Sequence, residues 1–316
     1  MIRPIIIVCA YNEQQNVTVL LKAMKAQTYG DFTFYLIDDG SVDATFSKAQ
    51  SYISEHSLSH FHILKKEHVG KEAAMREAIM SVADGNALIL TTDADCQPPA
   101  TWVECMVNKF EETGAAMLIG PVAIDGSHPF QATEFLSIEA VTLGSAAIGH
   151  PLMCGGANLG FRKDAYIKAN EYMPQGFDNG GDMYLLEAMK SLKVSISPVV
   201  SNSALVVTNG SDSIGGFIRQ RTRWAGKAPN YTDWEIIAAG LITVIIQAVF
   251  IAFLIGAFYN ITLLYVWIAK IIIDFIILTP VAVMQKRARL IPYILPVSLI
   301  YPFYTMVILI ISTFKR

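Results

Sequence analysis

The chain has 316 residues, of which 53% are hydrophobic and only 16% are charged, and its formal net charge is −3. This composition is too apolar for an ordinary water-soluble protein, and the near-neutral charge argues against a general nucleic-acid-binding protein. The apolar excess lies after Glu235, because no charged residue follows it until Lys270.

The four cysteines (Cys9, Cys96, Cys105 and Cys154) are scattered and show no CxxC spacing. This pattern indicates reduced thiols in a cytosolic compartment. Residues 1–5 lead directly into a β pattern without a cleavage-like site, so we expect no signal peptide. We therefore expect the N-terminal portion to stay in the cytoplasm.

The first half of the chain alternates short apolar strand patterns with helix patterns. Strands are predicted over 5–10, 32–37, 61–64, 87–91 and 116–122, and helices over 16–27, 43–55, 71–81, 101–113 and 130–149. This alternation predicts βαβ units and a parallel sheet, that is, an α/β, Rossmann-like fold. In such sheets the ligand lies beyond the carboxyl ends of the strands.

Polar residues suited to a nucleotide and its metal follow the first four predicted strands. They are Glu13, Asp38 with Asp39, Gly70 with Lys71, and Asp93 with Asp95. A carboxylate can accept hydrogen bonds from a base or ribose, and a lysine can contact phosphate. The first strand is not followed by GxGxxG and the chain lacks GxxxxGK[ST], which disfavours dinucleotide enzymes and P-loop NTPases.

Asp93 and Asp95 stand at positions i and i+2 after the apolar run 88–90, so on an extended chain their side chains point the same way. Two carboxylates this close repel one another unless a cation lies between them. Mg²⁺ or Mn²⁺ would suit this oxygen pair and would add phosphate oxygens to it. The alternative is a loop that carries two solvated acids, but the neighbouring loops favour a metal–diphosphate site.

Two glycine-containing segments follow. Gly155 and Gly156 would let the backbone approach a bulky ligand, or they form a plain turn before a strand. The loop 176–181 feeds a helix with Asp182 at or near its N-cap. Asp182 either caps this helix or acts as a general base, and the sequence leaves both roles open.

Residues 213–228 form a basic, aromatic helix pattern in which Gln220, Arg223 and Trp224 stand at i, i+3 and i+4, on one face. This face offers an amide, a guanidinium for a diphosphate and an indole for a sugar ring. A basic, aromatic segment is also what the border of a membrane predicts, although that alternative does not require the glutamine.

Three apolar segments are long enough to cross a bilayer: 236–258, 261–283 and 291–314. Prolines interrupt the third, which leaves open whether it crosses fully or is re-entrant. The basic stretch 285–289 predicts a cytoplasmic loop. Lys270 and Asp274, at i and i+4 inside the second segment, are expected to pair with each other, and a contact between Lys270 and a lipid phosphate is the alternative.

In this order the motifs resemble those of membrane-anchored family 2 glycosyltransferases, which have the GT-A fold. The matching pieces are Ala10-Tyr11-Asn12-Glu13, Asp38-Asp39-Gly40-Ser41, Gly70-Lys71, Asp93-Ala94-Asp95, Gly156-Ala157-Asn158 with Arg162, Gly181-Asp182 and Gln220-x-x-Arg223-Trp224. We therefore expect a cytosolic GT-A domain over 1–212, an interfacial segment over 213–235 and a membrane domain of two to three helices over 236–316.

The resemblance also implies roles for individual residues. Nucleotide-sugar contacts would come from Ala10, Tyr11, Glu13, Asp39, Lys71, Asp93, Gln220 and Arg223, and acceptor contacts from Gly156, Ala157, Asn158 and Trp224. Asp95 would bind Mg²⁺ or Mn²⁺, and Asp182 would be the catalytic base. Many relatives carry an acid immediately before this base, whereas Gly181 stands here, so a helper carboxylate is missing.

We thus expect an inverting hexosyltransferase of the cell envelope that is a multi-pass protein of the cytoplasmic membrane with its catalytic domain in the cytosol. It would move a sugar from a nucleoside-diphosphate sugar, with UDP favoured, to a lipid or a lipid-linked or polysaccharide acceptor. A processive β-polysaccharide synthase is the nearest alternative. A metal-dependent nucleotidyltransferase lacks support because no basic, glycine-rich triphosphate loop is seen near the N-terminus, and a catalytically idle scaffold would not need Asp93, Asp95 and Asp182 together.

Overall fold

The computed structural model describes residues 2–82, 87–174, 176 and 180–314, which form two compact units. The first unit comprises residues 1–122 and 142–209, and the second comprises residues 123–141 and 210–316. The predicted three-part division at 212 and 235 stays a prediction. The compact units group residues 123–141 with the C-terminal part of the chain, which that division did not anticipate.

The first unit is built on a mixed sheet whose described strands run in the order β3-β2-β1-β4-β7-β5-β8. Their bounds are β1 Ile5–Ala10, β2 Thr33–Asp38, β3 Phe61–Lys65, β4 Leu88–Thr91, β5 Met117–Ile119, β7 Leu159–Arg162 and β8 Ile196–Pro198. The α/β, Rossmann-like fold predicted from the alternating pattern is confirmed. The prediction of a parallel sheet is wrong at β7, which pairs antiparallel with both β4 and β5.

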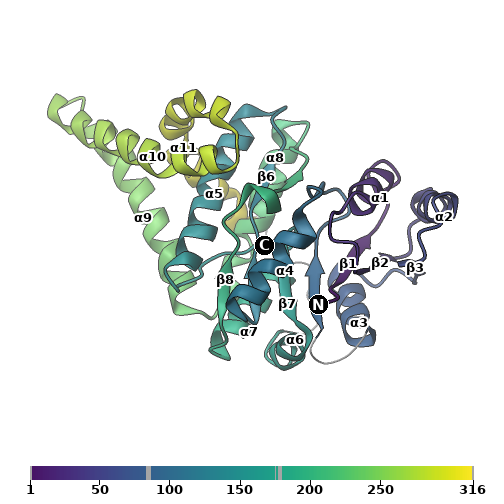
Figure 1. Ribbon diagram of the computed structural model, residues 1–316. Helices are drawn as coiled ribbons and strands as arrows, with labels where there is room; N and C mark the ends of the chain where they lie inside the picture. The colour runs from purple at the N-terminus through teal and green to yellow at the C-terminus, as the bar shows by residue number, and fades with distance from the viewer. Residues whose placement is uncertain (1, 83–86, 175, 177–179, 315–316) are drawn as a thin grey trace. The chain divides into compact units, whose positions relative to one another are not determined.

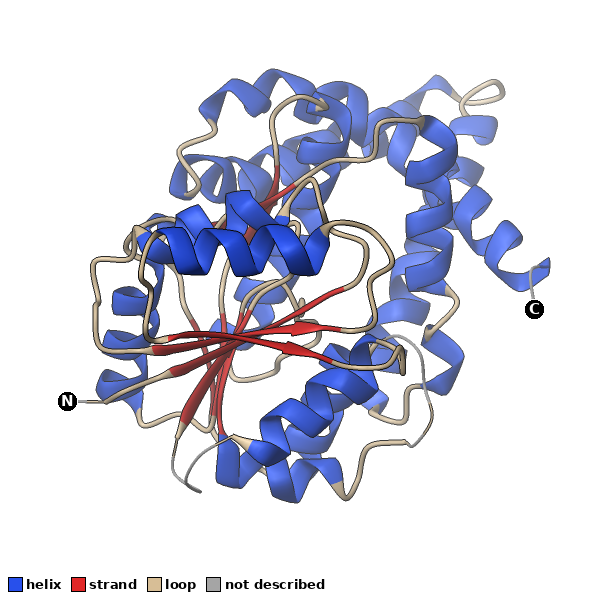
Figure 2. Cartoon of the chain, turned by 90° about the vertical axis from the view of Figure 1, so that its right-hand side faces the viewer, coloured by secondary structure: helices blue, strands red, loops and turns tan. Residues whose placement is uncertain are grey.

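Helices cover both faces of this sheet, as an apolar central strand such as β1 requires, and every residue of β1 is buried. Helices α1 (Val17–Lys25) and α2 (Thr45–Glu55) lie on one side of the strands, and α3 (Lys71–Ser81) lies on the other (Figure 1). Figure 2 shows the strands nearly edge-on, with helices above and below them. The remaining helices of this unit are α4 (Trp102–Thr113), α6 (Lys163–Asn170) and α7 (Gly181–Ser191).

The strand predicted over 116–122 is in fact two strands, because the chain breaks at Gly120 and Pro121. Proline has no N–H to donate to a sheet, and a Cβ on Gly120 would overlap the side-chain amide of Asn158. After this break β6 (Val122–Ile124) does not belong to the seven-stranded sheet. Later in the chain, β9 (Val206–Thr208) does not belong to it either.

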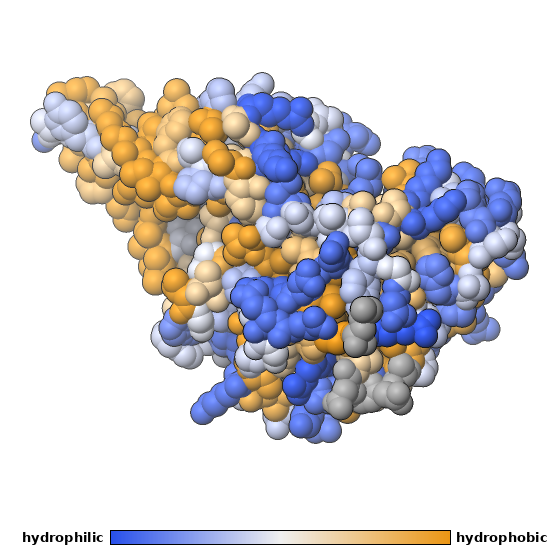
Figure 3. All heavy atoms as spheres, in the orientation of Figure 1, coloured by the Kyte–Doolittle hydropathy of each residue, from blue (hydrophilic) through white to orange (hydrophobic). Residues whose placement is uncertain are grey.

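The second unit is mainly helical. Its elements are the first part of α5 (Pro129–Ala147), α8 (Ile214–Ala225), α9 (Trp234–Gly256), α10 (Leu264–Met284) and α11 (Ile294–Phe314). Among the described residues, three helical stretches are long and apolar enough to cross a membrane: 234–256, 261–284 and 288–314. Figure 3 shows the hydrophobic surface that α9 and α10 present.

These stretches match the three predicted apolar segments, and α11 continues as a helix through Pro302. Whether the third stretch crosses fully stays a prediction. The expected pair inside the second segment is confirmed, because Lys270 Nζ donates to Asp274 Oδ2 at 2.5 Å and to the carbonyl oxygen of Ser298 at 3.0 Å.

Candidate active site

The carboxyl ends of β1, β2 and β4 meet at the centre of the first unit's sheet, where β1 lies between the other two. Ala10 pairs with Asp38 in the register of β1 and β2. The loops that follow are tied together, since Asn12 N–H donates to Ser41 Oγ at 2.9 Å and Glu13 N–H donates to Thr45 Oγ1 at 2.7 Å. The strand order runs from β3 back to β1 and then jumps to β4, so it reverses between β1 and β4. Open α/β sheets bind their ligands at such a reversal.

An aromatic surface and a buried carboxylate lie at this edge. The ring of Tyr11 stacks on His68 with centroids 4.2 Å apart. Asp39, which is 1% exposed, accepts hydrogen bonds from the N–H groups of Val69 at 2.9 Å and Gly70 at 3.1 Å. In this structure Asp39 therefore positions the loop before α3, and its predicted contact with a base stays a prediction. No sequence motif gave His68 a role in the site.

Lys71, the first residue of α3, forms an ion pair with Asp93 in the loop after β4. Desolvation lowers the pKa of Lys71, but the carboxylates of Asp93, Glu72 and Asp182 raise it by more, so its net shift is upward. The ammonium group therefore stays charged and lies within an acidic cluster. This combination suits a diphosphate that carries its own divalent cation.

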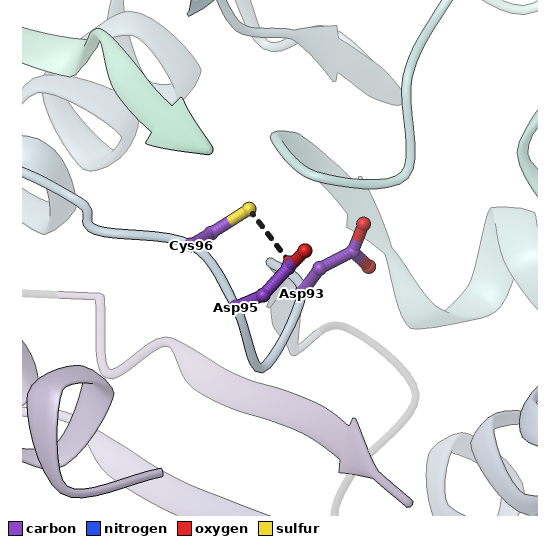
Figure 4. A group of neighbouring side chains, drawn as sticks. All are labelled: Asp93, Asp95 and Cys96. Atoms are coloured by element: carbon purple, nitrogen blue, oxygen red, sulfur yellow. Dashed lines mark hydrogen bonds between the residues drawn. The ribbon is translucent and has the colours of Figure 1, made fainter. Parts of the chain in front are cut away.

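Asp93, Asp95 and Cys96 offer ligand atoms within 4.8 Å of one another (Figure 4). Burial raises the pKa of Asp95, and the nearby charge of Asp93 raises it further. A bound cation would oppose both effects, because it stabilises the ionised carboxylates. The two carboxylates are hard oxygen donors and so fit Mg²⁺ or Mn²⁺.

Two further side chains hold Asp95. Its Oδ1 accepts a hydrogen bond from the thiol of Cys96 at 3.6 Å, and its Oδ2 accepts one from Thr208 Oγ1 at 3.5 Å. Burial raises the pKa of the Cys96 thiol well above its ordinary value, so it stays protonated and orients Asp95 rather than acting as a thiolate ligand. The charges of this cluster also act on Glu13: burial raises the pKa of Glu13, and the charges of Asp95 and Asp93 raise it further.

The two glycine-containing segments meet at Asp182. This residue is the second of α7, and its Oδ2 accepts a hydrogen bond from the N–H of Gly156 at 3.0 Å. Its Oδ1 accepts from the N–H of Met183 at 2.9 Å. The N-cap of α7 is Gly180, so Asp182 is not the capping residue. Residues 177–179 of the loop lie outside the described residues.

Asn158 does not fit its predicted role, since its side chain is completely buried. Its Oδ1 accepts a hydrogen bond from Trp102 Nε1 at 2.8 Å, and its Nδ2 donates to the carbonyl oxygens of Pro121 and Ala204, each at 2.8 Å. The amide thus joins the start of α4 to Pro121, after β5, and to the turn at Ala204. An acceptor contact in this segment would have to come from Gly156 and Ala157.

Gln220, Arg223 and Trp224 belong to α8 of the second unit. Gln220 Oε1 accepts a hydrogen bond from Arg221 at 2.8 Å, and the guanidinium of Arg221 lies 4.3 Å from the Trp224 ring. Arg221 is buried and donates to Glu134 of α5 at 2.6 Å. No sequence motif predicted this pair, although an acid within the apolar stretch 130–149 was a signal for it.

A family model described as Glycosyl transferase family 2 matches residues 5–168, which is more than half of the chain. An N-acetylglucosaminyltransferase of Bradyrhizobium diazoefficiens is 26% identical over 250 residues, which cover 73% of this chain and 50% of the relative. A dodecaprenyl-phosphate galacturonate synthase of Rhizobium johnstonii is 30% identical over 118 residues, covering 36% of this chain and 34% of that protein. The chain spans about half the length of the curated N-acetylglucosaminyltransferases that it matches.

Solved structures share the fold at low sequence identity. A mannosyltransferase from Pyrobaculum calidifontis, in complex with GDP-Man and Mn²⁺, has a TM-score of 0.58 and 17% identity, covering 94% of this chain and 87% of that one. TarS 1–349 of S. aureus in complex with UDP-GlcNAc has a TM-score of 0.53 and 16% identity, covering 96% and 90%.

Proposed function

Because this chain belongs to glycosyl transferase family 2, we propose that it is an inverting glycosyltransferase that acts at a membrane. Its donor is a nucleoside-diphosphate sugar, and its acceptor is a hydroxyl or phosphate oxygen of a lipid or a lipid-linked glycan. The observation that carries this proposal is the cluster at the sheet edge. Lys71 pairs with Asp93, the ligand atoms of Asp93 and Asp95 lie within 4.8 Å of one another, and the charge of Asp182 in the same unit acts on Lys71. We assign the diphosphate and the divalent cation to this cluster.

On the donor side, the segment Ala10 to Glu13 and Asp39 hold the nucleoside, and Lys71 and Asp93 face the diphosphate and ribose. Asp95, with Asp93 beside it, would hold the divalent cation. When bound, Mg²⁺ or Mn²⁺ neutralises the charge of the diphosphate and so makes it a better leaving group. The predicted roles of Gln220 and Arg223 toward the diphosphate, and of Trp224 toward the acceptor, stay predictions.

On the acceptor side, Asp182 takes the proton from the attacking hydroxyl. The acceptor oxygen then forms its bond to the anomeric carbon while the bond from that carbon to the diphosphate oxygen breaks, and the nucleoside diphosphate leaves with the electron pair. Attack from the face opposite the leaving group inverts the anomeric centre. An acceptor that already carries a negative charge, such as a lipid phosphate, needs less help from the base.

The membrane helices and the relatives support a lipid acceptor. Three helical stretches of the described part of the chain could cross a membrane, and the relative from Rhizobium johnstonii is named a dodecaprenyl-phosphate galacturonate synthase. The N-acetylglucosaminyltransferases among the relatives, and the UDP-GlcNAc bound in the TarS structure, make UDP-GlcNAc the first donor to test. The positive-inside rule puts the basic loop 285–289 on the cytoplasmic side. If the stretches 234–256 and 261–284 each cross the membrane, the sheet unit that precedes them lies on that same side.

The decisive assay incubates the full chain in detergent with single nucleotide sugars and with polyprenyl phosphate or a membrane lipid extract. Release of nucleoside diphosphate and a labelled lipid product are measured. We expect Asp182→Asn to lower transfer to a hydroxyl acceptor about 10²–10⁴-fold without loss of nucleotide affinity. Asp31→Asn, an exposed acid of the same unit, is the matched control. Wild-type turnover in Asp182→Asn would refute the assignment of the base.

The same assay tests the cation. Chelation with EDTA should abolish transfer, and adding back Mn²⁺ or Mg²⁺ separately should restore it and show which ion serves. Asp95→Asn should raise the metal concentration needed for half-maximal rate. Full activity in the presence of the chelator would remove the cation from the proposal, and release of pyrophosphate would indicate a nucleotidyltransferase instead.

A further inference from the structure

The start of α3 and the start of α7 are joined by one carboxylate. Glu72 is the second residue of α3, and its Oε1 accepts a hydrogen bond from the N–H of Gly181 at 3.1 Å. Gly181 is the first residue of α7 and directly precedes Asp182. Glu72 in turn directly follows Lys71, whose ammonium group pairs with Asp93.

The carboxylate of Glu72 leaves no room for a side chain at position 181 unless Glu72 itself moves. The φ angle of Gly181 is not positive, so any residue could adopt its backbone conformation. A Cβ placed there, however, would lie 2.6 Å from Cδ of Glu72 and would overlap the carboxylate. The carboxylate of Glu72 therefore occupies the space in which a side chain of residue 181 would begin.

The electrostatics favour this arrangement. The first N–H groups of a helix have no partner within the helix and carry a partial positive charge, so a carboxylate there is stabilising. The N-cap residue Gly180 supplies no side-chain hydrogen bond. Glu72 provides, from a different helix, the acceptor that a capping side chain would otherwise supply.

We propose that Glu72 is a positioning residue for Asp182, and that its carboxylate replaces, from α3, the acidic side chain missing at position 181. This inference rests on the proposed function. Glu72 fixes the first turn of α7 and thereby the carboxylate of Asp182, while its neighbour Lys71 holds the donor side. The two halves of the reaction are thus aligned through two consecutive residues of one helix.

The test compares Glu72→Ala and Glu72→Gln with Glu77→Ala, an exposed acid on the same helix. We expect Glu72→Ala to lower kcat about 10–100-fold, the scale at which a misplaced catalytic group costs rate, with an unchanged Kd for the nucleotide sugar. Glu72→Gln keeps a hydrogen-bond acceptor for Gly181 and should recover most of kcat, and Glu77→Ala should match the wild type. Wild-type kcat in Glu72→Ala, or a loss confined to donor Kd, would overturn the inference.

Variants at Gly181 test the contact itself. Gly181→Ala should displace the carboxylate and lower kcat as Glu72→Ala does, and the double variant Glu72→Ala/Gly181→Ala should be no worse than either. Glu72→Ala/Gly181→Glu returns a carboxylate from the other side and should regain activity over Glu72→Ala. Multiplicative losses in the first double variant would contradict a shared contact.

A further readout needs no turnover, so it separates this inference from the proposed function. Hydrogen exchange in a peptide covering residues 180–186 should be faster in Glu72→Ala than in Glu77→Ala. Equal exchange would overturn the positioning role even if transfer is seen. If the wild-type protein transfers no sugar but exchange is faster in Glu72→Ala, the contact between Glu72 and the start of α7 is supported. Only the proposed function is then refuted.

Discussion

Two residues predicted for the same site, Asp182 and Asn158, differ in what surrounds them. Asp182 keeps part of its surface exposed and accepts a hydrogen bond from the backbone of Gly156. Asn158 is enclosed, and its partner Trp102 stands 56 positions away in the sequence. A polar side chain next to glycines predicts a ligand contact equally well in both cases, and only burial separates the two roles.

The enclosed amide leads to a prediction about stability. Asn158→Ala removes the partner of the Trp102 N–H and leaves the carbonyl oxygens of Pro121 and Ala204 without it. Each buried group left unsatisfied costs about 1–3 kcal/mol, so we expect a clear loss of unfolding free energy. Asn108→Ala on the exposed face of α4 is the control, with denaturant unfolding in detergent as the measurement. Equal midpoints for the two variants would contradict this account.

The thiols around the site lead to a prediction about reactivity. Burial, and then the charge of Asp39, raise the pKa of Cys9 to about 12, and burial and Asp182 raise that of Cys154. The reactive thiolate forms only as pH rises through the pKa, so both thiols stay protonated and slow at pH 8. Iodoacetamide followed by mass spectrometry should therefore label the half-buried Cys105 first. Early labelling of Cys9 in the folded protein would show that this prediction is wrong.

Among the helices of the second unit, the ion pair between Arg221 and Glu134 joins α8 to α5. The pair is almost fully buried, and the guanidinium also lies over the rings of Trp224 and Phe217 at 4.3 and 4.7 Å. A charge in such surroundings is tolerated only with its partner in place. The aromatic and basic residues of α8 thus serve helix packing as well as their proposed role toward substrate.

Breaking this pair from one side should be costly. Arg221→Met leaves the carboxylate of Glu134 buried and unpaired, for which we expect a loss of about 3–5 kcal/mol. Arg219→Met, at an exposed position of the same helix, should cost little. Arg221→Met/Glu134→Met removes both charges and should regain most of the loss, as followed by thermal unfolding in detergent. A single variant as stable as the Arg219 control would contradict the structural role of the pair.

For the whole molecule, residues 123–141 belong to the same compact unit as residues 210–316. Within that unit Tyr304 of α11 donates a hydrogen bond to Glu134 at 3.4 Å, and Phe217 of α8 stacks on Tyr304 at 5.6 Å. A chain cut before the membrane helices would therefore lose part of the packing of α5 and α8.

Truncation after Asp233 tests this. The shortened chain exposes the apolar faces that α11 covers within the second unit, so we expect it to aggregate or to unfold at a lower temperature than the full chain in detergent. Size-exclusion chromatography and thermal unfolding are the measurements. A monodisperse truncated protein that unfolds cooperatively at the midpoint of the full chain would show that the second unit does not depend on its membrane helices.

Local sequence determined the elements and the acids at the strand ends. Apolar runs such as residues 5–10 and 88–91, the spacing of Asp93 and Asp95, and the three apolar segments are properties of neighbouring residues, which periodicity and composition report directly. The tertiary structure alone decided the antiparallel direction of β7, the burial of Asn158 and the pairing of Arg221 with Glu134. It also decided the contact between Glu72 and Gly181, which stand 109 positions apart. Such contacts depend on which elements pack together, and no short-range pattern in a single sequence encodes that choice.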